Sequence, residues 1–118
     1  GFVDGEFWKL SEPLLYEVKE GDVITVPTGF ITDFASVPIV ASFFLPKSGE
    51  YDPAAVVHDW LYYKKERSRD ESDHIFIDAM KCLGVSLLKA GIMYYAVRAF
   101  GWIPWKYGKD KQNIEMRK

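Results

Sequence analysis

The sequence predicts one α+β domain in which short antiparallel strands come first and three α-helices follow. Two observations predict this order. The first half alternates β-branched and aromatic segments with turn residues, and the second half holds three segments bounded by helix-capping residues. A chain of 118 residues can bury a hydrophobic core without disulfides. We expect a single domain over 1–118, with a strand and loop half over about 1–50, a helical half over about 51–105 and a basic tail over 106–118.

The strands are predicted from β-branched residues and from turns. Residues 23–26 (VITV) form the clearest strand because all four side chains are β-branched. Residues 14–18 would pair with them in a hairpin around Gly21. Residues 7–10 are expected to form another short strand.

Each predicted helix has a start signal. Asp52 can cap the first helix, and Pro53 is tolerated in its first turn. Ser68 and Glu71 have the spacing of a capping box for the second helix. Gly91 in the third would permit a close helix crossing. The three helices are therefore expected over about 53–66, from Ser68 to Gly84, and from Ser86 to a closing Gly101.

Composition excludes several classes of protein. The net charge is -2, and the only basic stretch is the short tail over 106–118, so we expect no nucleic-acid partner. The single cysteine, Cys82, excludes an internal disulfide and favours a reducing compartment. No signal peptide is visible, and no apolar run approaches the roughly 20 residues of a membrane span. The aromatic content of 16% predicts a groove or interface lined with Trp and Tyr.

The first candidate site lies in the sequence HDWLY of the first helix. His58 and Tyr62 are four residues apart and therefore project from one face. Asp59 lies about 100 degrees further round, close enough to share a cleft. A short turn to the next helix would bring Asp73 against His58, where its carboxylate would fix the imidazole tautomer and raise its basicity. Asp59 would then hold a hard cation through oxygen.

The second candidate is the polar set Thr32, Asp33 and Ser36, which lies in an aromatic-rich segment. A buried Asp needs partners. Asp33 is expected either to accept backbone N–H groups in a self-capping turn or to point at His58 or a metal. Ser36 lacks the G-x-S-x-G surroundings of a nucleophile. A short helix is expected near 37–44.

Two other interpretations of the histidine site stay open. In a structural interpretation, Asp59 makes only local hydrogen bonds and Asp73 complements the dipole of its helix. A metal-dependent phosphohydrolase would need an upstream histidine and a further downstream aspartate. The other histidine, His74, lies downstream, and the upstream half consists of strand and loop. We rank the phosphohydrolase lower for this reason.

The HDxxY helix followed by an Asp resembles the active-site helix pair of phospholipase A2 enzymes. The resemblance implies that His58 is the base, that Asp59 is a calcium ligand, and that Tyr62 and Asp73 support the histidine. Those enzymes also use a glycine-rich calcium loop. The nearest candidate for it here is 28–33, in which Asp33 would replace some of the ligands.

Four sequence blocks resemble the phage and bacterial family called domain of unknown function 1353. The resemblance implies a phage or prophage setting, in the host cytoplasm or in the virion, and it implies no activity. Ser72 is a modest departure, since the family more often has Ala there. The blocks are VPTGFITDFASVP at 26–38, AAVVHDWLY at 54–62, SRDESDHIF at 68–76 and MYYAVRAFG at 93–101. They suggest one shared site made of Asp33, His58, Asp59, Tyr62 and Asp73.

Two functional hypotheses follow. In the first, the protein is a phage-associated hydrolase of phospholipid esters. His58 activates water, Asp73 orients it, and Asp59 with Asp33 holds a calcium ion. This hypothesis needs His58 within hydrogen-bond reach of Asp73 in an open cleft. In the second, the protein is a non-catalytic tail, virion or accessory component. Exposed aromatic residues would then contact phage structural proteins or another copy of the chain, and the His-Asp cluster would be a structural network.

Overall fold

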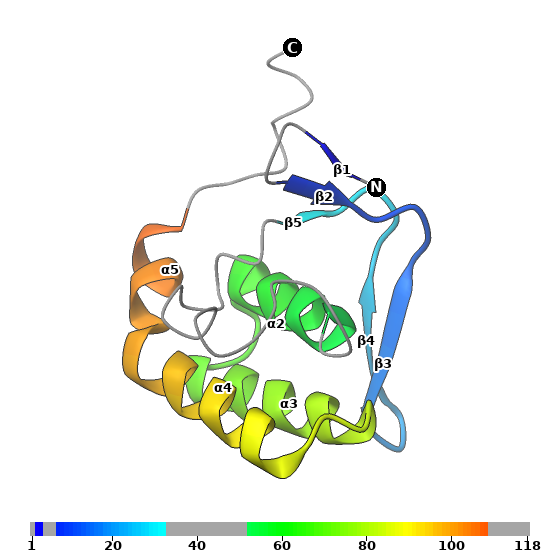
Figure 1. The fold of residues 1–118 in the computed structure, drawn as a ribbon. Helices are drawn as coiled ribbons and strands as arrows, with labels where there is room; N and C mark the ends of the chain where they lie inside the picture. Colours follow the sequence, from blue (N-terminus) through cyan, green and yellow to red (C-terminus); the bar gives the residue numbers. More distant parts are fainter. Residues whose placement is uncertain (1, 4–6, 33–51, 109–118) are drawn as a thin grey trace.

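The computed structural model describes residues 2–3, 7–32 and 52–108, and the structural statements below concern those residues. Within them, antiparallel strands are followed by helices, which confirms the α+β class (Figure 1). The elements in chain order are β1 (Phe2–Val3), β2 (Phe7–Lys9), β3 (Leu14–Lys19), β4 (Asp22–Val26), β5 (Ile31–Thr32), α2 (Asp52–Lys64), α3 (Arg69–Cys82), α4 (Leu87–Phe100) and α5 (Trp102–Tyr107). The expected helix near 37–44 lies outside the described residues.

β3 and β4 form the hairpin expected around Gly21. Tyr16 pairs with Ile24 in an antiparallel register, and the register shifts between Glu17 and Lys19. Gly21 has a φ of 82°, a left-handed conformation that glycine adopts without steric cost. The other strands form a separate antiparallel sheet in the order β1-β2-β5. The sequence did not predict β1 and β5, because two-residue strands carry no detectable alternation.

The helices begin where the capping residues predicted. The Oγ atoms of Ser68 and Ser86 accept backbone N–H bonds at the starts of α3 and α4, from donors 3.0 and 3.2 Å away. The described residues show no close crossing at Gly91, because none of their atoms outside the local backbone of α4 lies within 4 Å of a Cβ built there. Helix α5 was also missed. None of these helices is both long and apolar enough to cross a membrane.

Two hydrophobic clusters hold these elements together on opposite sides of α2. Figure 1 shows α2 between the β3–β4 hairpin and the pair α3–α4. The α3–α4 core contains Ala54, Ala55, Phe76, Ala79, Met80, Val85, Ala90, Met93 and Val97. The hairpin core contains Ile24, Val26, Phe30, Val56, Val57, Leu61 and Ile75. Helices α2 and α3 contribute residues to both cores, and Tyr16 of β3 packs against both, so these three elements connect the two halves.

Candidate functional site

A buried histidine–aspartate pair joins α2 to α3. His58 Nε2 lies 2.6 Å from Asp73 Oδ1, and both side chains are 0% exposed. A short turn between the helices brings these two residues together, as the sequence analysis expects. An Asp on Nε2 fixes the orientation of the imidazole ring and stabilises a positive charge on it.

Tyr62 completes the arrangement from the same face of α2. Its hydroxyl donates to Asp73 Oδ1 over 2.7 Å, so the histidine and the tyrosine share one carboxylate oxygen. The ring centroids of Tyr62 and His58 are 4.3 Å apart. The Phe76 ring stacks on the imidazole with a centroid distance of 4.5 Å. Trp105 of α5 meets Tyr62 edge-on at 5.0 Å. Aromatic rings therefore hold the imidazole in position on more than one side.

Two arginines bind the second oxygen of the same carboxylate. Arg98 Nη1 of α4 donates to Asp73 Oδ2 over 2.8 Å, and Arg69 Nη1 lies 3.5 Å from that oxygen. Arg69 also donates to the Val97 carbonyl, 3.0 Å away, near the C-terminus of α4. Sequence reasoning missed both arginines. The available signal was that Arg98 is the only charged residue in the block MYYAVRAFG.

These contacts determine the ionisation of the site. Burial acts to raise the pKa of Asp73, but hydrogen bonds from His58, Tyr62 and Arg98 outweigh burial and hold that pKa below its usual value. Burial and the neighbouring carboxylate raise the pKa of Tyr62 above its usual value. The site therefore holds an ionised Asp73 and a protonated Tyr62 hydroxyl at neutral pH.

Asp59 takes part in a second buried contact. Its carboxylate accepts a hydrogen bond from the hydroxyl of Thr32, which ties α2 to β5. Thr32 was expected in a polar set with Asp33 and Ser36, and those two lie outside the described residues. Over the ranges 7–32 and 52–108, no group of three His, Cys, Asp or Glu side chains could hold a metal ion. The described residues therefore do not form a calcium shell by themselves.

The site is closed to solvent. His58 and Asp73 are fully buried, and Asp59 and Tyr62 are nearly so. The hydrolase hypothesis needs His58 within hydrogen-bond distance of Asp73, and this condition is met. It also needs an open cleft at the imidazole, and the described residues show none.

Comparison with known proteins places this site in a family. A sequence model of the family described as "Protein of unknown function (DUF1353)" matches residues 8–97. The chain belongs to the DUF1353 family. The match includes His58, Asp59, Tyr62 and Asp73, and Arg98 follows it directly.

Two curated relatives come from Sinorhizobium fredii (strain NBRC 101917 / NGR234). The protein printed as "Uncharacterized protein y4iH" is 39% identical over 72 residues, which are 59% of this chain and 30% of that protein. "Uncharacterized protein y4jT" is 31% identical over 105 residues, which are 85% of this chain and 31% of that protein. The DUF1353 chain thus spans less than a third of the length of each relative. No solved structure matches it.

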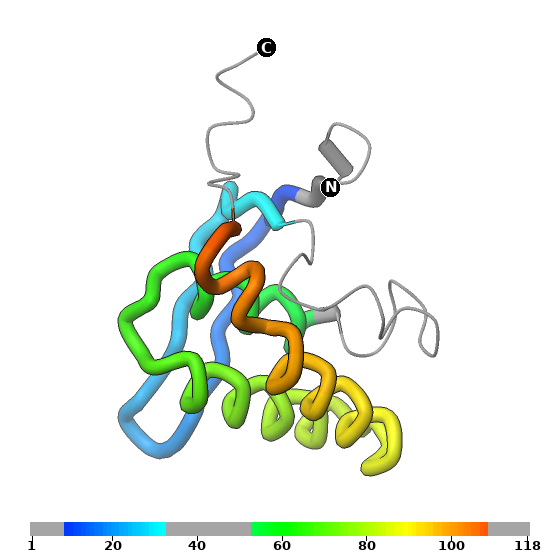
Figure 2. The backbone as a smooth tube through the Cα atoms, turned by 90° about the vertical axis from the view of Figure 1, so that its left-hand side faces the viewer, coloured from blue at the N-terminus to red at the C-terminus, as the bar shows by residue number. Residues whose placement is uncertain are grey.

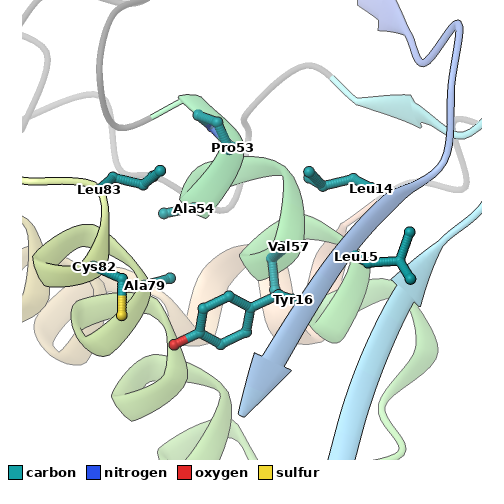
Figure 3. A pocket seen from close by; sticks show the side chains of 9 residues that line it. All are labelled: Leu14, Leu15, Tyr16, Pro53, Ala54, Val57, Ala79, Cys82 and Leu83. Atoms are coloured by element: carbon teal, nitrogen blue, oxygen red, sulfur yellow. The ribbon is translucent and has the colours of Figure 1, made fainter.

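An apolar pocket of the DUF1353 domain lies apart from the histidine site. It opens between β3, the start of α2 and the end of α3, and Leu14, Ala54 and Leu83 are part of its wall (Figure 3). Its polar groups come from Tyr16 and Cys82. Burial and the nearby Cys82 raise the pKa of Tyr16 to about 12. Because the phenol stays protonated at neutral pH, Tyr16 cannot supply a base to this pocket.

Proposed function

We propose that this DUF1353 domain is a hydrolase in which His58 is the general base and Asp73 positions it. The observation that carries the proposal is the 2.6 Å contact from His58 Nε2 to Asp73 Oδ1, with the Tyr62 hydroxyl on the same oxygen. The proposal assigns proton transfer to Nδ1, the ring nitrogen that Asp73 does not contact, and requires that water reach this atom. The resemblance of the HDxxY helix to phospholipase A2 enzymes implies the same roles, with His58 as the base and Asp73 as its support.

The proposed reaction is the hydrolysis of a phospholipid ester. His58 Nδ1 takes a proton from water while the water oxygen attacks the ester carbonyl. Asp73 stabilises the imidazolium, and it stays ionised because its pKa is held low by the surrounding donors. The imidazolium then gives the proton to the leaving alkoxide oxygen, which yields a fatty acid and a lysophospholipid.

Access to His58 is the first requirement that the proposal must meet. The chain has two histidines, and the side chain of the other, His74, is 57% exposed. In a His74→Gln variant, diethyl pyrocarbonate can modify only one imidazole. We expect His58 to react in the folded variant, more slowly than His74 does in a His58→Gln variant. If His58 reacts only after unfolding, water cannot reach it and the hydrolase proposal fails.

Activity is tested by fatty-acid release from phosphatidylglycerol vesicles. The His58→Gln variant retains an amide N–H near the Nε2 position but loses the base. We expect release to fall by about 10²- to 10⁴-fold in folded His58→Gln and to persist in His74→Gln. Parallel assays with calcium and with a chelator test the calcium requirement that the resemblance implies. Wild-type protein that releases no fatty acid under either condition would exclude a phospholipase.

Complete burial of the site favours a second candidate, a non-catalytic phage tail, virion or accessory component. A fully buried carboxylate with donors from α2, α3 and α4 ties three helices together. In this case His58 resists modification, no release is detected, and removal of the Asp73 charge changes only stability. The phage setting comes from the family resemblance and is part of this proposal.

A further inference from the structure

Helix α4 is apolar on its outer face as well as on its inner face. Ala90, Met93 and Val97 point into the α3–α4 core and are buried. On the other side, Leu88 and Tyr95 are 75% and 72% exposed. A surface helix normally carries polar residues on its solvent side, so a helix that is apolar all round indicates that something covers it.

Helix α5 follows α4 directly and also carries exposed large apolar side chains. Helical hydrogen bonds pass through the junction, from Gly101 N to Val97 O and from Trp105 N to Gly101 O. Figure 2 shows α4 and α5 nearest the viewer, on the side of the molecule away from the hairpin. We define the α4–α5 face by its exposed large apolar side chains, which are Leu87, Leu88, Ile92, Tyr95, Phe100, Trp102, Ile103 and Tyr107.

The charged side chains that α4 and α5 themselves carry are all basic. Residues 79–109 contain five Lys and Arg residues and no Asp or Glu, although the whole chain has a net charge of -2. Arg98 binds the buried Asp73 and lies 3.6 Å from the exposed Asp70 of α3. Lys89 and Lys106 are exposed on α4 and α5. Protein–protein interfaces are depleted in lysine. Apolar and aromatic side chains bordered by lysines are typical of surfaces that bind anionic bilayers.

We propose that the α4–α5 face docks on a bilayer of anionic phospholipid. Its apolar side chains would enter the headgroup boundary, while Lys89 and Lys106 meet lipid phosphates. The inference names the surface on which the proposed hydrolase meets its substrate and rests on the proposed function for that purpose. Binding of the protein to vesicles is measured without ester hydrolysis, so its outcome does not depend on whether the protein is a hydrolase.

The test is sedimentation of the protein with vesicles of phosphatidylglycerol and phosphatidylcholine, compared with vesicles of phosphatidylcholine alone. We expect binding that is stronger with phosphatidylglycerol and that weakens as salt is added. Leu88→Gln with Tyr95→Gln should lower the partition coefficient by about tenfold or more, because two large apolar side chains are lost. Lys89→Gln and Lys106→Gln should each lower it by about fivefold on anionic vesicles.

A matched control removes exposed apolar side chains elsewhere. Leu15→Thr with Val23→Thr changes two exposed residues of the hairpin and should leave vesicle binding unchanged. Circular dichroism of each variant checks that it is folded. Three results would overturn the proposal. They are a wild type that does not bind anionic vesicles, equal binding by the Leu88 and Tyr95 double variant, and a dimer that this double variant dissociates.

One further variant separates this inference from the hydrolase. His58→Gln removes the proposed base and should bind vesicles as wild type does. Binding without any fatty-acid release would leave the docking face standing while the hydrolase fails. Release without measurable binding would leave the hydrolase standing while the docking face fails.

Discussion

Asp73 is the residue on which most of the site contacts converge. It is fully buried, and it accepts from Tyr62 and Arg98 and contacts His58. Asp73→Asn removes the charge that these donors surround, so it should lower the free energy of unfolding by about 3 kcal/mol. Urea denaturation measures the change. Asp78→Asn makes the same chemical change at an exposed position of α3 and should stay within about 0.5 kcal/mol of wild type. Equal effects of the two substitutions would contradict this role for Asp73.

The lowered pKa of Asp73 also predicts how stability depends on pH. The unfolded carboxyl has a pKa of about 3.9, so the contribution of Asp73 is fully present above this value. As pH falls below it, the unfolded chain takes up the proton first, and stability is lost until pH passes the lower folded pKa. Below about pH 4 the stability of wild type should therefore fall more steeply than that of Asp73→Asn, by up to about 1.4 kcal/mol per pH unit.

Denaturation at a series of acidic pH values measures this difference in slope. Asp22 also has a lowered pKa, because Arg67 binds it, but both proteins contain that pair and its effect cancels in the comparison. Parallel curves for wild type and Asp73→Asn would show that the two proteins take up the same number of protons on unfolding, against the prediction.

The sequence was sufficient to predict the pairs that depend on local geometry. His58 and Tyr62 share a helix face, and a short turn fixes where Asp73 can lie. Arg98 and Thr32 reach the site residues from 25 and 27 positions away, so their contacts depend on how whole elements cross. Local periodicity in the sequence does not indicate how two distant elements cross. For this reason neither the Arg98–Asp73 contact nor the Thr32–Asp59 contact could be predicted.

At the scale of elements, the caps predicted the helices better than the glycines did. Ser68 and Ser86 marked two helix starts correctly because a capping side chain acts on the next three residues only. Helix α5 was not predicted, although its Pro104 lies in the first turn, where proline is tolerated. The close approach expected at Gly91 is instead found at Gly101, where α4 meets α5.

These two glycines give a matched test of that junction. A Cβ on Gly101 would lie 2.5 Å from the Tyr62 hydroxyl oxygen and even closer to the Val97 carbonyl. Gly101→Ala should therefore destabilise the protein by about 1–3 kcal/mol, because backbone atoms cannot move aside freely. Gly91→Ala meets open space inside a helix and should stabilise it by about 0.5–1 kcal/mol. Thermal unfolding of both variants measures the two signs, and a stabilising Gly101→Ala would contradict the close packing.

At the scale of the whole molecule, the two cores should unfold together. Helix α2 contributes Ala55 to the α3–α4 core and Val57 to the hairpin core, and the histidine site links α2 to α3 and α4. A local loss in one core therefore removes support from the other. This coupling makes a single cooperative transition the expected behaviour for a domain of this size.

Met80→Ala and Val26→Ala test that coupling from the two sides. Each side chain is 0% exposed, so truncation leaves a cavity and should cost about 2–4 kcal/mol for Met80 and somewhat less for the smaller Val26. We expect far-UV circular dichroism, which follows the helices, and amide exchange of β3 and β4 to report the same loss of stability in each variant. If Val26→Ala loosens the hairpin amides while the helical signal keeps the wild-type midpoint, the hairpin opens separately. The α2 helix would then not transmit stability between the cores.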